Sequence, residues 1–521
     1  MLPTRYNVRM KAGYASLITV HTSNGDFKIN SPENGALLSD LLRQNGLSPD
    51  MPCAGRGICG KCRVRAQGAL SEVTAQEKAL LSEEELSGEV RLACRTAVHG
   101  DAEITLPDTG SLHAVTEGRG AFFRLSPFGK RLGLAADIGT TTVAAYLYDL
   151  KTGVRLGARA VKNPQSAFGA DVVSRQKHSL SGGGKELAAA VRGCISSLAK
   201  ALADEAGQSI SDIDAAVFCG NTTMIYLLMG YGVSDIAAAP FNASHLFGEF
   251  ISGASLFPEL APDCRIYLPP CISAYVGSDT VCAVLASGMT ESTHPVLLAD
   301  IGTNGEMALF SESRLLCCST AAGPAFEGAG IECGTGAVPG AIDRVRAENG
   351  NLKIHTLSDA PPCGICGSGL LDAANALLKT GRLDETGRFT SESEREYLSN
   401  SVYISQKDIR NIQLAKSAVR AGIETLLLRA GIAENTLPEL YIAGGFGSLL
   451  SPESAAGIGM IPSGMLSSCT ALGNAAGLGA CDILLSEDAL QKCGEIIRIS
   501  RTLELASDAK FSESFIENML F

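Results

Sequence analysis

The sequence predicts two parts of different fold class, a small α+β domain of the β-grasp type followed by a larger, internally duplicated α/β core. Three observations support this prediction. Two short alternating strands, a helix and a cysteine-rich loop follow one another in the first hundred residues. Strand-like runs alternate with amphipathic helical stretches from Leu132 onward, for example over 186–205 and 409–430. A segment containing Asp-Ile-Gly-Thr occurs twice in this second part, which indicates a duplicated unit.

The length of 521 residues exceeds what one compact core usually contains, so we expect several domains. We place the first domain at residues 1–106 and a linker at 107–131, because that stretch is polar, carries glycine and shows little periodicity. The core then consists of a region over 132–208 with the first copy of the repeat and a remainder over 209–521 with the second copy.

The composition is that of an acidic protein, with 45% hydrophobic residues, 19% charged residues and a net charge of −12. This charge argues against a nucleic-acid partner. The first fifteen residues contain no apolar run suited to a signal peptide or a membrane span, so we expect a cytoplasmic protein with no membrane partner. Of the 17 cysteines, we expect clustered ones to be metal ligands and scattered ones to be reduced core thiols rather than disulfides.

The first domain begins with two alternating strands within residues 16–30. They flank Asn24-Gly25, a strong signal for a hairpin turn. A helix is expected from about Ala36 to Asn45, and the cysteine-rich loop follows it. This order of hairpin, helix and loop is typical of a β-grasp domain.

Four cysteines have the spacing of an iron-sulfur site: Cys53, Cys59, Cys62 and Cys94. The first three share one glycine-rich loop and the fourth is 32 positions further on, which predicts a [2Fe-2S] cluster. Glycines in such a loop let backbone N–H groups approach the sulfur atoms. The alternative is a structural zinc site, but those sites usually contain two short Cys-x2-Cys pairs. The remaining Cys-x2-Cys, Cys363 to Cys366, lies among glycines and favours a close-packed turn over a redox or metal role.

The two repeats have the character of phosphate-binding turns. In each, an aspartate ends a strand and is followed by a glycine turn and then by hydroxyl or amide side chains, an arrangement that receives anions. Asp137 and Asp300 are predicted catalytic residues that hold Mg²⁺, usually through water. The predicted cofactor-binding residues of the two turns are Gly139, Thr140, Thr141, Thr142, Gly302, Thr303, Asn304 and Gly305. The alternative for either copy alone is a plain β-turn.

Two further carboxylates, Glu306 and Glu327, lie beside glycine-rich turns. Such a group can orient water for hydrolysis or bind magnesium, and we favour Glu306 as the catalytic one. The alternative for both is a structural carboxylate behind the ligands. A third glycine element follows a strand-like run and would leave bare backbone against which an adenine ring could lie. It consists of Gly444, Gly445, Phe446 and Gly447.

The two turns and the later glycine element together resemble the superfamily of acetate and sugar kinases, Hsp70 and actin. The resemblance implies duplicated ribonuclease H-like subdomains with ATP and Mg²⁺ between them. The two Asp-Ile-Gly-Thr turns would then hold the phosphates, and residues 444–447 would line the adenosine pocket. Members of this superfamily use ATP for many purposes, so the fold alone does not select a reaction.

With the cluster domain added, the whole chain resembles the reductive activators of corrinoid-dependent enzymes. Beyond the cluster loop and the turns, the resemblance rests on five segments: 163–165, 169–172, 220–224, 321–328 and 366–369. It implies an ATP-hydrolysing activator that takes an electron from a low-potential donor such as a ferredoxin or flavodoxin. The electron would pass through the cluster to the Co(II) form of a corrinoid protein and restore Co(I) for methyl transfer. It also implies a homodimer.

Two other functions fit the same residues. One is a small-molecule kinase regulated by its redox domain, and the other is an ATP-driven reductase of a non-corrinoid partner. Some related activators carry additional four-iron clusters near the C-terminus. The run of cysteines that these need does not follow Cys366, so we expect a single cluster.

Overall fold

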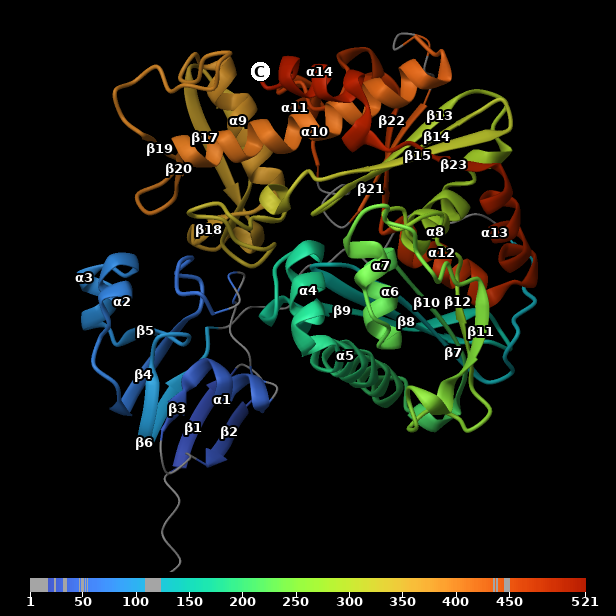
Figure 1. Cartoon of the computed structure of the whole chain (residues 1–521). Helices are drawn as coiled ribbons and strands as arrows, with labels where there is room; N and C mark the ends of the chain where they lie inside the picture. The colour runs from blue at the N-terminus through green and yellow to red at the C-terminus, as the bar shows by residue number, and fades with distance from the viewer. Residues whose placement is uncertain are drawn as a thin grey trace, which may run out of the picture. The chain divides into compact units, whose positions relative to one another are not determined.

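The structure is a computed structural model that describes residues 17–22, 25–30, 35–45, 47, 51, 53, 55–107, 123–433, 436, 439–444 and 450–521. The chain divides into two compact units, Met1–Thr109 and Gly110–Phe521 (Figure 1). Most of the predicted linker lies outside the described residues. Its last residues, 123–131, belong to the second unit, where Ser126 pairs with Ser486 in an isolated bridge.

The first unit is built on a mixed sheet in the order β2-β1-β6-β4-β5, with β3 paired to β6. The strands are β1 Leu17–Thr22, β2 Gly25–Asn30, β3 Ala36–Leu37, β4 Arg63–Leu70, β5 Val90–Leu92 and β6 Ala97–Thr105. β1 and β2 form the predicted antiparallel hairpin, while β1 runs parallel to β6. The predicted helix is shorter than expected, α1 Leu38–Gln44, because Ala36 and Leu37 are extended and pair with β6. Two short helices, α2 Ala75–Leu80 and α3 Glu83–Ser87, each begin with a capping box.

The second unit contains two six-stranded sheets that share the arrangement of five strands and differ in the edge at which the sixth strand lies. The first is ordered β11-β12-β10-β7-β8-β9 and the second β22-β21-β13-β14-β15-β23. In each sheet a three-stranded antiparallel meander, β7-β8-β9 or β13-β14-β15, is extended by parallel strands beside its first member. The meander strands are β7 Leu132–Ile138, β8 Thr142–Asp149, β9 Val154–Lys162, β13 Val296–Ile301, β14 Gly305–Ser311 and β15 Arg314–Thr320. This correspondence confirms the predicted duplication.

The parallel and edge strands of the two sheets are β10 Ile213–Gly220, β11 Glu249–Ser252, β12 Arg265–Leu268, β21 Glu439–Ala443, β22 Cys469–Gly473 and β23 Ser500–Thr502. Both repeated motifs lie at the tip of a hairpin, the first between β7 and β8 and the second between β13 and β14. A small sheet, β17-β16-β18, is added to the second half from β16 Ala341–Glu348, β17 Asn351–Thr356 and β18 Gly364–Ile365. β19 Arg395–Tyr397 and β20 Tyr403–Ser405 form a separate hairpin.

Helices cover both faces of each sheet. α5 Gly184–Glu205 packs against β8 and β9 through one apolar face. On the opposite face, α8 Ser278–Ser287 and α12 Ala475–Leu485 pack against each other and share one apolar core with buried residues of both sheets (Figure 1). Most residues of these two helices are buried, as expected of helices between two sheets. α10 Gln406–Ala430 and α9 Gly367–Lys379 belong to the core of the second half.

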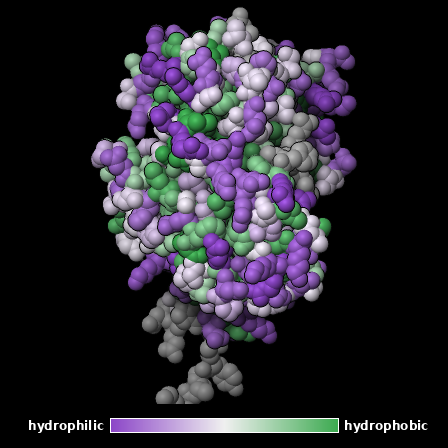
Figure 2. All heavy atoms as spheres, turned by 90° about the vertical axis from the view of Figure 1, so that its right-hand side faces the viewer, coloured by the Kyte–Doolittle hydropathy of each residue, from purple (hydrophilic) through white to green (hydrophobic). Residues whose placement is uncertain are grey.

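The remaining helices lie around this framework. They are α4 Val172–His178, α6 Thr222–Met229, α7 Ser234–Ala237, α11 Pro452–Gly457, α13 Glu487–Ile499 and α14 Ala509–Glu517. On the face that Figure 2 presents, hydrophilic and hydrophobic residues are interspersed. Among the described residues, no helix combines the length and the apolar character that crossing a bilayer requires.

Candidate functional site

The four predicted cluster ligands lie in the first unit as two pairs of thiols. The Sγ atoms of Cys62 and Cys94 are 3.3 Å apart, and the thiol of Cys53 forms a hydrogen bond with that of Cys59. Three of the four cysteines are buried, while Cys59 is partly exposed. A [2Fe-2S] cluster has two iron atoms that each take two cysteine ligands, so two pairs of thiols fit this group.

The pKa values of these thiols differ within each pair, being lowered for Cys53 and Cys94 and raised for Cys59 and Cys62. Burial raises the pKa of the Cys53 thiol, but hydrogen bonds from the backbone N–H groups of Ile58, Gly57 and Cys59 outweigh this effect and lower it. The contact with Cys62 lowers the pKa of Cys94 to about 7. Gly57 has a φ of +73°, and a Cβ there would meet the side chain of Arg95 at 1.9 Å. The loop therefore requires glycine at this position.

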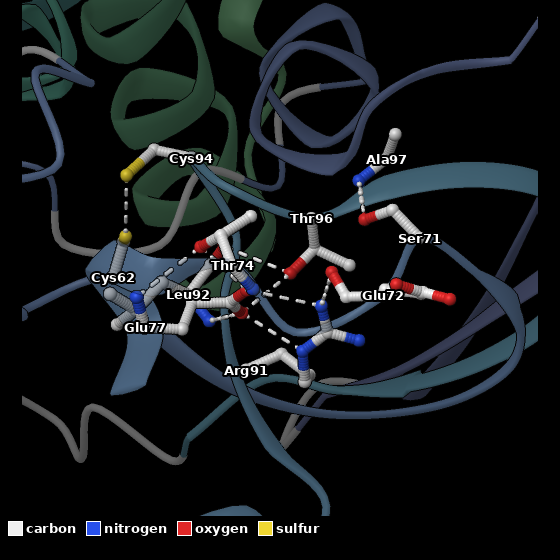
Figure 3. Close-up of polar contacts among 10 residues, drawn as sticks. All are labelled: Cys62, Ser71, Glu72, Thr74, Glu77, Arg91, Leu92, Cys94, Thr96 and Ala97. Carbon is white, nitrogen blue, oxygen red and sulfur yellow. Dashed lines mark hydrogen bonds and ion pairs between the residues drawn. The ribbon is translucent and has the colours of Figure 1, made fainter. Parts of the chain in front are cut away.

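A buried ion pair holds the strand segment that leads to Cys94 (Figure 3). The Glu77 side chain is fully buried, and Arg91 donates to it from Nε at 2.8 Å and from Nη2 at 3.1 Å. Its carboxylate also accepts from the N–H of Leu92 at 3.1 Å and from the hydroxyl of Thr96 at 3.2 Å. Since Leu92 and Thr96 flank Cys94 on either side, Glu77 fixes the backbone that presents this cysteine.

The second candidate site is a cavity of about 240 Å³ in the second unit, lined by both repeated turns. All but one of the described residues that were predicted to bind ATP or Mg²⁺ contribute to its wall. They are Asp137, Gly139, Thr140, Thr141, Thr142, Asp300, Gly302, Thr303, Asn304, Glu306 and Gly444. The exception is Gly305, which is buried between Thr320 and Val419. Gly445, Phe446 and Gly447 lie outside the described residues.

Five carboxylates line this cavity, those of Asp137, Asp279, Asp300, Glu306 and Glu327. Burial raises the pKa of Asp300 to about 8 and that of Asp137 to about 7, and the negative charge of Asp279 adds to both effects. Burial also raises the pKa of Asp279 to about 6 and that of Glu306 well above its ordinary value. A cation bound beside one of these carboxylates would favour its ionised form.

Gly444 brings the strand β21 into direct contact with the second turn. Its φ is +98°, and a Cβ at this position would lie 2.5 Å from Oδ1 of Asp300 and 2.9 Å from the carbonyl oxygen of Ile301. A larger residue would therefore displace the carboxylate of Asp300.

Glu327 joins the two turns directly. Its Oε2 atom accepts hydrogen bonds from the hydroxyl groups of Thr141, at 2.5 Å, and Thr303, at 2.7 Å. Oε1 accepts from the N–H group of Thr303 at 3.1 Å. The two threonines lie in hairpin turns of different sheets, so this carboxylate connects the two halves of the core.

Known protein families match the parts of the chain that contain the two candidate sites. Residues 20–99 match the family model of the 2Fe-2S iron-sulfur cluster binding domain, residues 132–292 that of the RACo middle region, and residues 294–521 that of the C-terminal domain of RACo, the ASKHA domain. The corrinoid activation enzyme RamQ of Eubacterium limosum is 32% identical over 419 residues, which cover 75% of this chain and 70% of that enzyme. The chain belongs to the family of reductive corrinoid activators.

Two other members support this assignment to the family of activators. The [Co(II) methylated amine-specific corrinoid protein] reductase of Methanosarcina barkeri is 27% identical over 397 residues, covering 70% of this chain and 72% of the reductase. A solved structure of a reductive activator for a corrinoid, iron-sulfur protein superimposes with a TM-score of 0.71 at 28% identity, covering 97% of this chain and 98% of that one. The activator fold predicted from the sequence, an iron-sulfur domain followed by an ASKHA core, is confirmed.

The structure adds three polar residues that the motifs of this activator did not single out. Asp279 lies in the first turn of α8, where a Gly-Ser-Asp-Thr sequence has the pattern of a plain helix start. Asn474 forms a hydrogen bond with Asp137 from the start of α12. Arg175 is fully buried in α4, and its Nη2 donates to the carbonyl oxygen of Thr140 at 2.6 Å. Only folding brings these residues to the turns, which are at least 21 positions away in the sequence.

Proposed function

We propose that this protein is an ATP-dependent reductive activator that restores the Co(I) state of a corrinoid protein. In this proposal Cys53, Cys59, Cys62 and Cys94 hold a [2Fe-2S] cluster, which supplies a one-electron carrier between a low-potential donor and the Co(II) corrinoid. Such a donor is a ferredoxin or a flavodoxin. Asp137 and Asp300 hold Mg²⁺, and the two turns bind the phosphates of ATP.

One observation supports this proposal above the others. A cluster-binding domain and an ATPase-type core occur in one chain, and the likeness to a reductive activator of known structure extends over 97% of that chain. Two relatives that match most of the chain are named for corrinoid activation or reduction. A kinase regulated by a redox domain would share the core but not this end-to-end likeness.

The energetics explain why one chain would combine a cluster with an ATPase. Plant-type ferredoxin clusters have reduction potentials near roughly −400 mV, and Co(I) is more reducing than that. A gap of ~120 mV for one electron corresponds to ~2.8 kcal/mol, or about a hundredfold in the equilibrium constant. Nucleotide binding or hydrolysis can supply this only by favouring one of two conformations or partner complexes. The residues that respond to nucleotide are therefore as important as the cluster ligands.

The proposal is tested by mixing the purified full-length protein with Mg·ATP, a chemical reductant and candidate corrinoid proteins, and recording the cobalt absorption spectrum. We expect conversion of Co(II) to Co(I) that depends on ATP and releases inorganic phosphate. If no corrinoid protein is reduced in an ATP-dependent way, the proposed function is wrong. Transfer of phosphate to a metabolite would instead identify a kinase.

A further inference from the structure

Glu327 occupies hydrogen-bond donors that a bound phosphate would also need. Its carboxylate accepts hydrogen bonds from two threonine hydroxyls and one backbone N–H group. Hydroxyl and N–H donors at a glycine turn are also the groups that receive the oxygens of a phosphate. Because Thr141 and Thr303 are predicted phosphate-binding residues, Glu327 and a nucleotide phosphate would require the same donors.

The carboxylate also draws the two turns together. The hydroxyl oxygens of Thr141 and Thr303 are 3.3 Å apart, although the first residue follows β7 and the second follows β13. Glu327 ends the short 3-10 helix Pro324–Glu327, which contacts both α9 and α10. A movement of this segment would therefore change its contacts with α9 and α10.

A buried cation behind the first turn favours an anion at this position. The hydrogen bonds of the Arg175 guanidinium go to the carbonyl oxygens of Thr140 and Gly169 and to the side chains of Gln165 and Met224, all of them neutral. Burial lowers the pKa of Arg175 to about 10, and the charges of Asp171 and Glu327 act in the opposite direction. A buried cation gains stability from a nearby negative charge. The carboxylate of Glu327 supplies such a charge, and a phosphate group would supply it equally.

We propose that Glu327 is a latch that closes the two phosphate turns when no nucleotide is bound and that the phosphates of ATP displace. The inference rests on the proposed function, since it assumes that ATP binds between these turns. Displacement releases the Glu327 side chain from the two threonines, and the Pro324–Glu327 segment, which contacts α9 and α10, transmits this change to the two helices. The latch residue is a positioning residue, because it acts through the two threonines.

The proposal is tested by measuring ATP affinity by calorimetry on the full-length protein, with Mg²⁺ and in the presence of a chelator. We expect Glu327→Ala to lower the Kd for ATP about tenfold or more in both conditions, because the competing carboxylate is gone. Tenfold corresponds to about 1.4 kcal/mol. Glu327→Gln keeps the size of the side chain, removes its charge and should change the affinity in the same direction. Glu348→Gln, at an exposed ion pair on β16, is the matched control and should leave the Kd unchanged.

The outcomes separate this inference from the proposed function. If both Glu327 variants bind Mg·ATP more weakly than the wild type while binding of metal-free ATP is unchanged, Glu327 is a magnesium ligand and the latch is refuted. Unchanged affinity in both conditions also refutes it. If the wild-type protein itself binds no ATP, the proposed function fails at its first step and the latch fails with it. Limited proteolysis without nucleotide gives a second readout, and we expect faster cleavage of the Glu327 variants than of the control.

Discussion

Replacement of Glu77 by glutamine tests how much the buried ion pair contributes to the cluster domain. Glu77 is fully buried and accepts hydrogen bonds from Arg91, Thr74, Leu92 and Thr96. Burial opposes its ionisation, but these donors outweigh that effect and lower its pKa from 4.5 to about 2. A shift of this size corresponds to roughly 3 kcal/mol of stability. Removal of one partner from a buried pair costs about 3–5 kcal/mol in other proteins, which agrees in size.

The sign of the pH dependence follows from the direction of the shift. Because the folded-state pKa of Glu77 lies below its ordinary value, the stabilisation is complete above about pH 4.5 and is lost as the pH falls through about 2. At neutral pH the wild-type protein therefore has the full contribution. The Glu77→Gln variant lacks it at every pH, so the difference between the two proteins should shrink below pH 4.5.

The assay is urea unfolding of the full-length, cluster-loaded protein at pH 7, followed by the loss of visible cluster absorbance. With a dependence of about 1–3 kcal/mol per molar urea, Glu77→Gln should lower the midpoint by ~1–3 M. Glu85→Gln is a matched control, because Glu85 pairs with Arg63 at 2.7 Å in a partly exposed position where such pairs contribute about 1 kcal/mol or less. If the two variants lose cluster at the same urea concentration as the wild type, the stabilising role assigned to Glu77 is wrong.

Three further predictions concern the separate roles proposed for the cluster domain and the nucleotide cavity. Cys59→Ala should abolish the visible spectrum of the cluster but leave ATP binding intact, whereas Asp300→Ala should abolish Mg·ATP binding but leave the cluster spectrum intact; loss of both properties in both variants would contradict this. Gly444→Ala should weaken Mg·ATP binding at least tenfold by calorimetry, since its Cβ would lie 2.5 Å from Asp300, while Gly193→Ala, with open space around it, should not. Because the pKa of Asp300 is raised to about 8 and its protonated form does not bind a cation, Mg·ATP affinity should fall as the pH is lowered from 8 to 6; a flat profile would contradict this assignment.

Local sequence patterns were sufficient to predict much of the fold. The hairpin β1-β2 follows from alternation around Asn-Gly, and the long helices α5 and α10 follow from apolar periodicity. The two-sheet plan follows from the repeat, because two similar segments adopt similar hairpins. Helix α1 was the exception, since its predicted first residues pair with a strand some sixty positions later, and local propensity does not record such a contact.

The candidate sites also contain some residues that the sequence identified and others that only the fold brings together. Their cysteines and turn residues are close in sequence or recur as a motif, so the sequence by itself determined which chemical groups they offer. Asp279, Arg175 and the contact of Glu327 with both turns depend on which helices and loops face one cavity, and this is set by the packing of two sheets around α8 and α12. Burial likewise decides the protonation of the cavity carboxylates and the strength of the Glu77 pair, because the cost of an isolated charge depends on what surrounds it. Only the tertiary structure sets those surroundings.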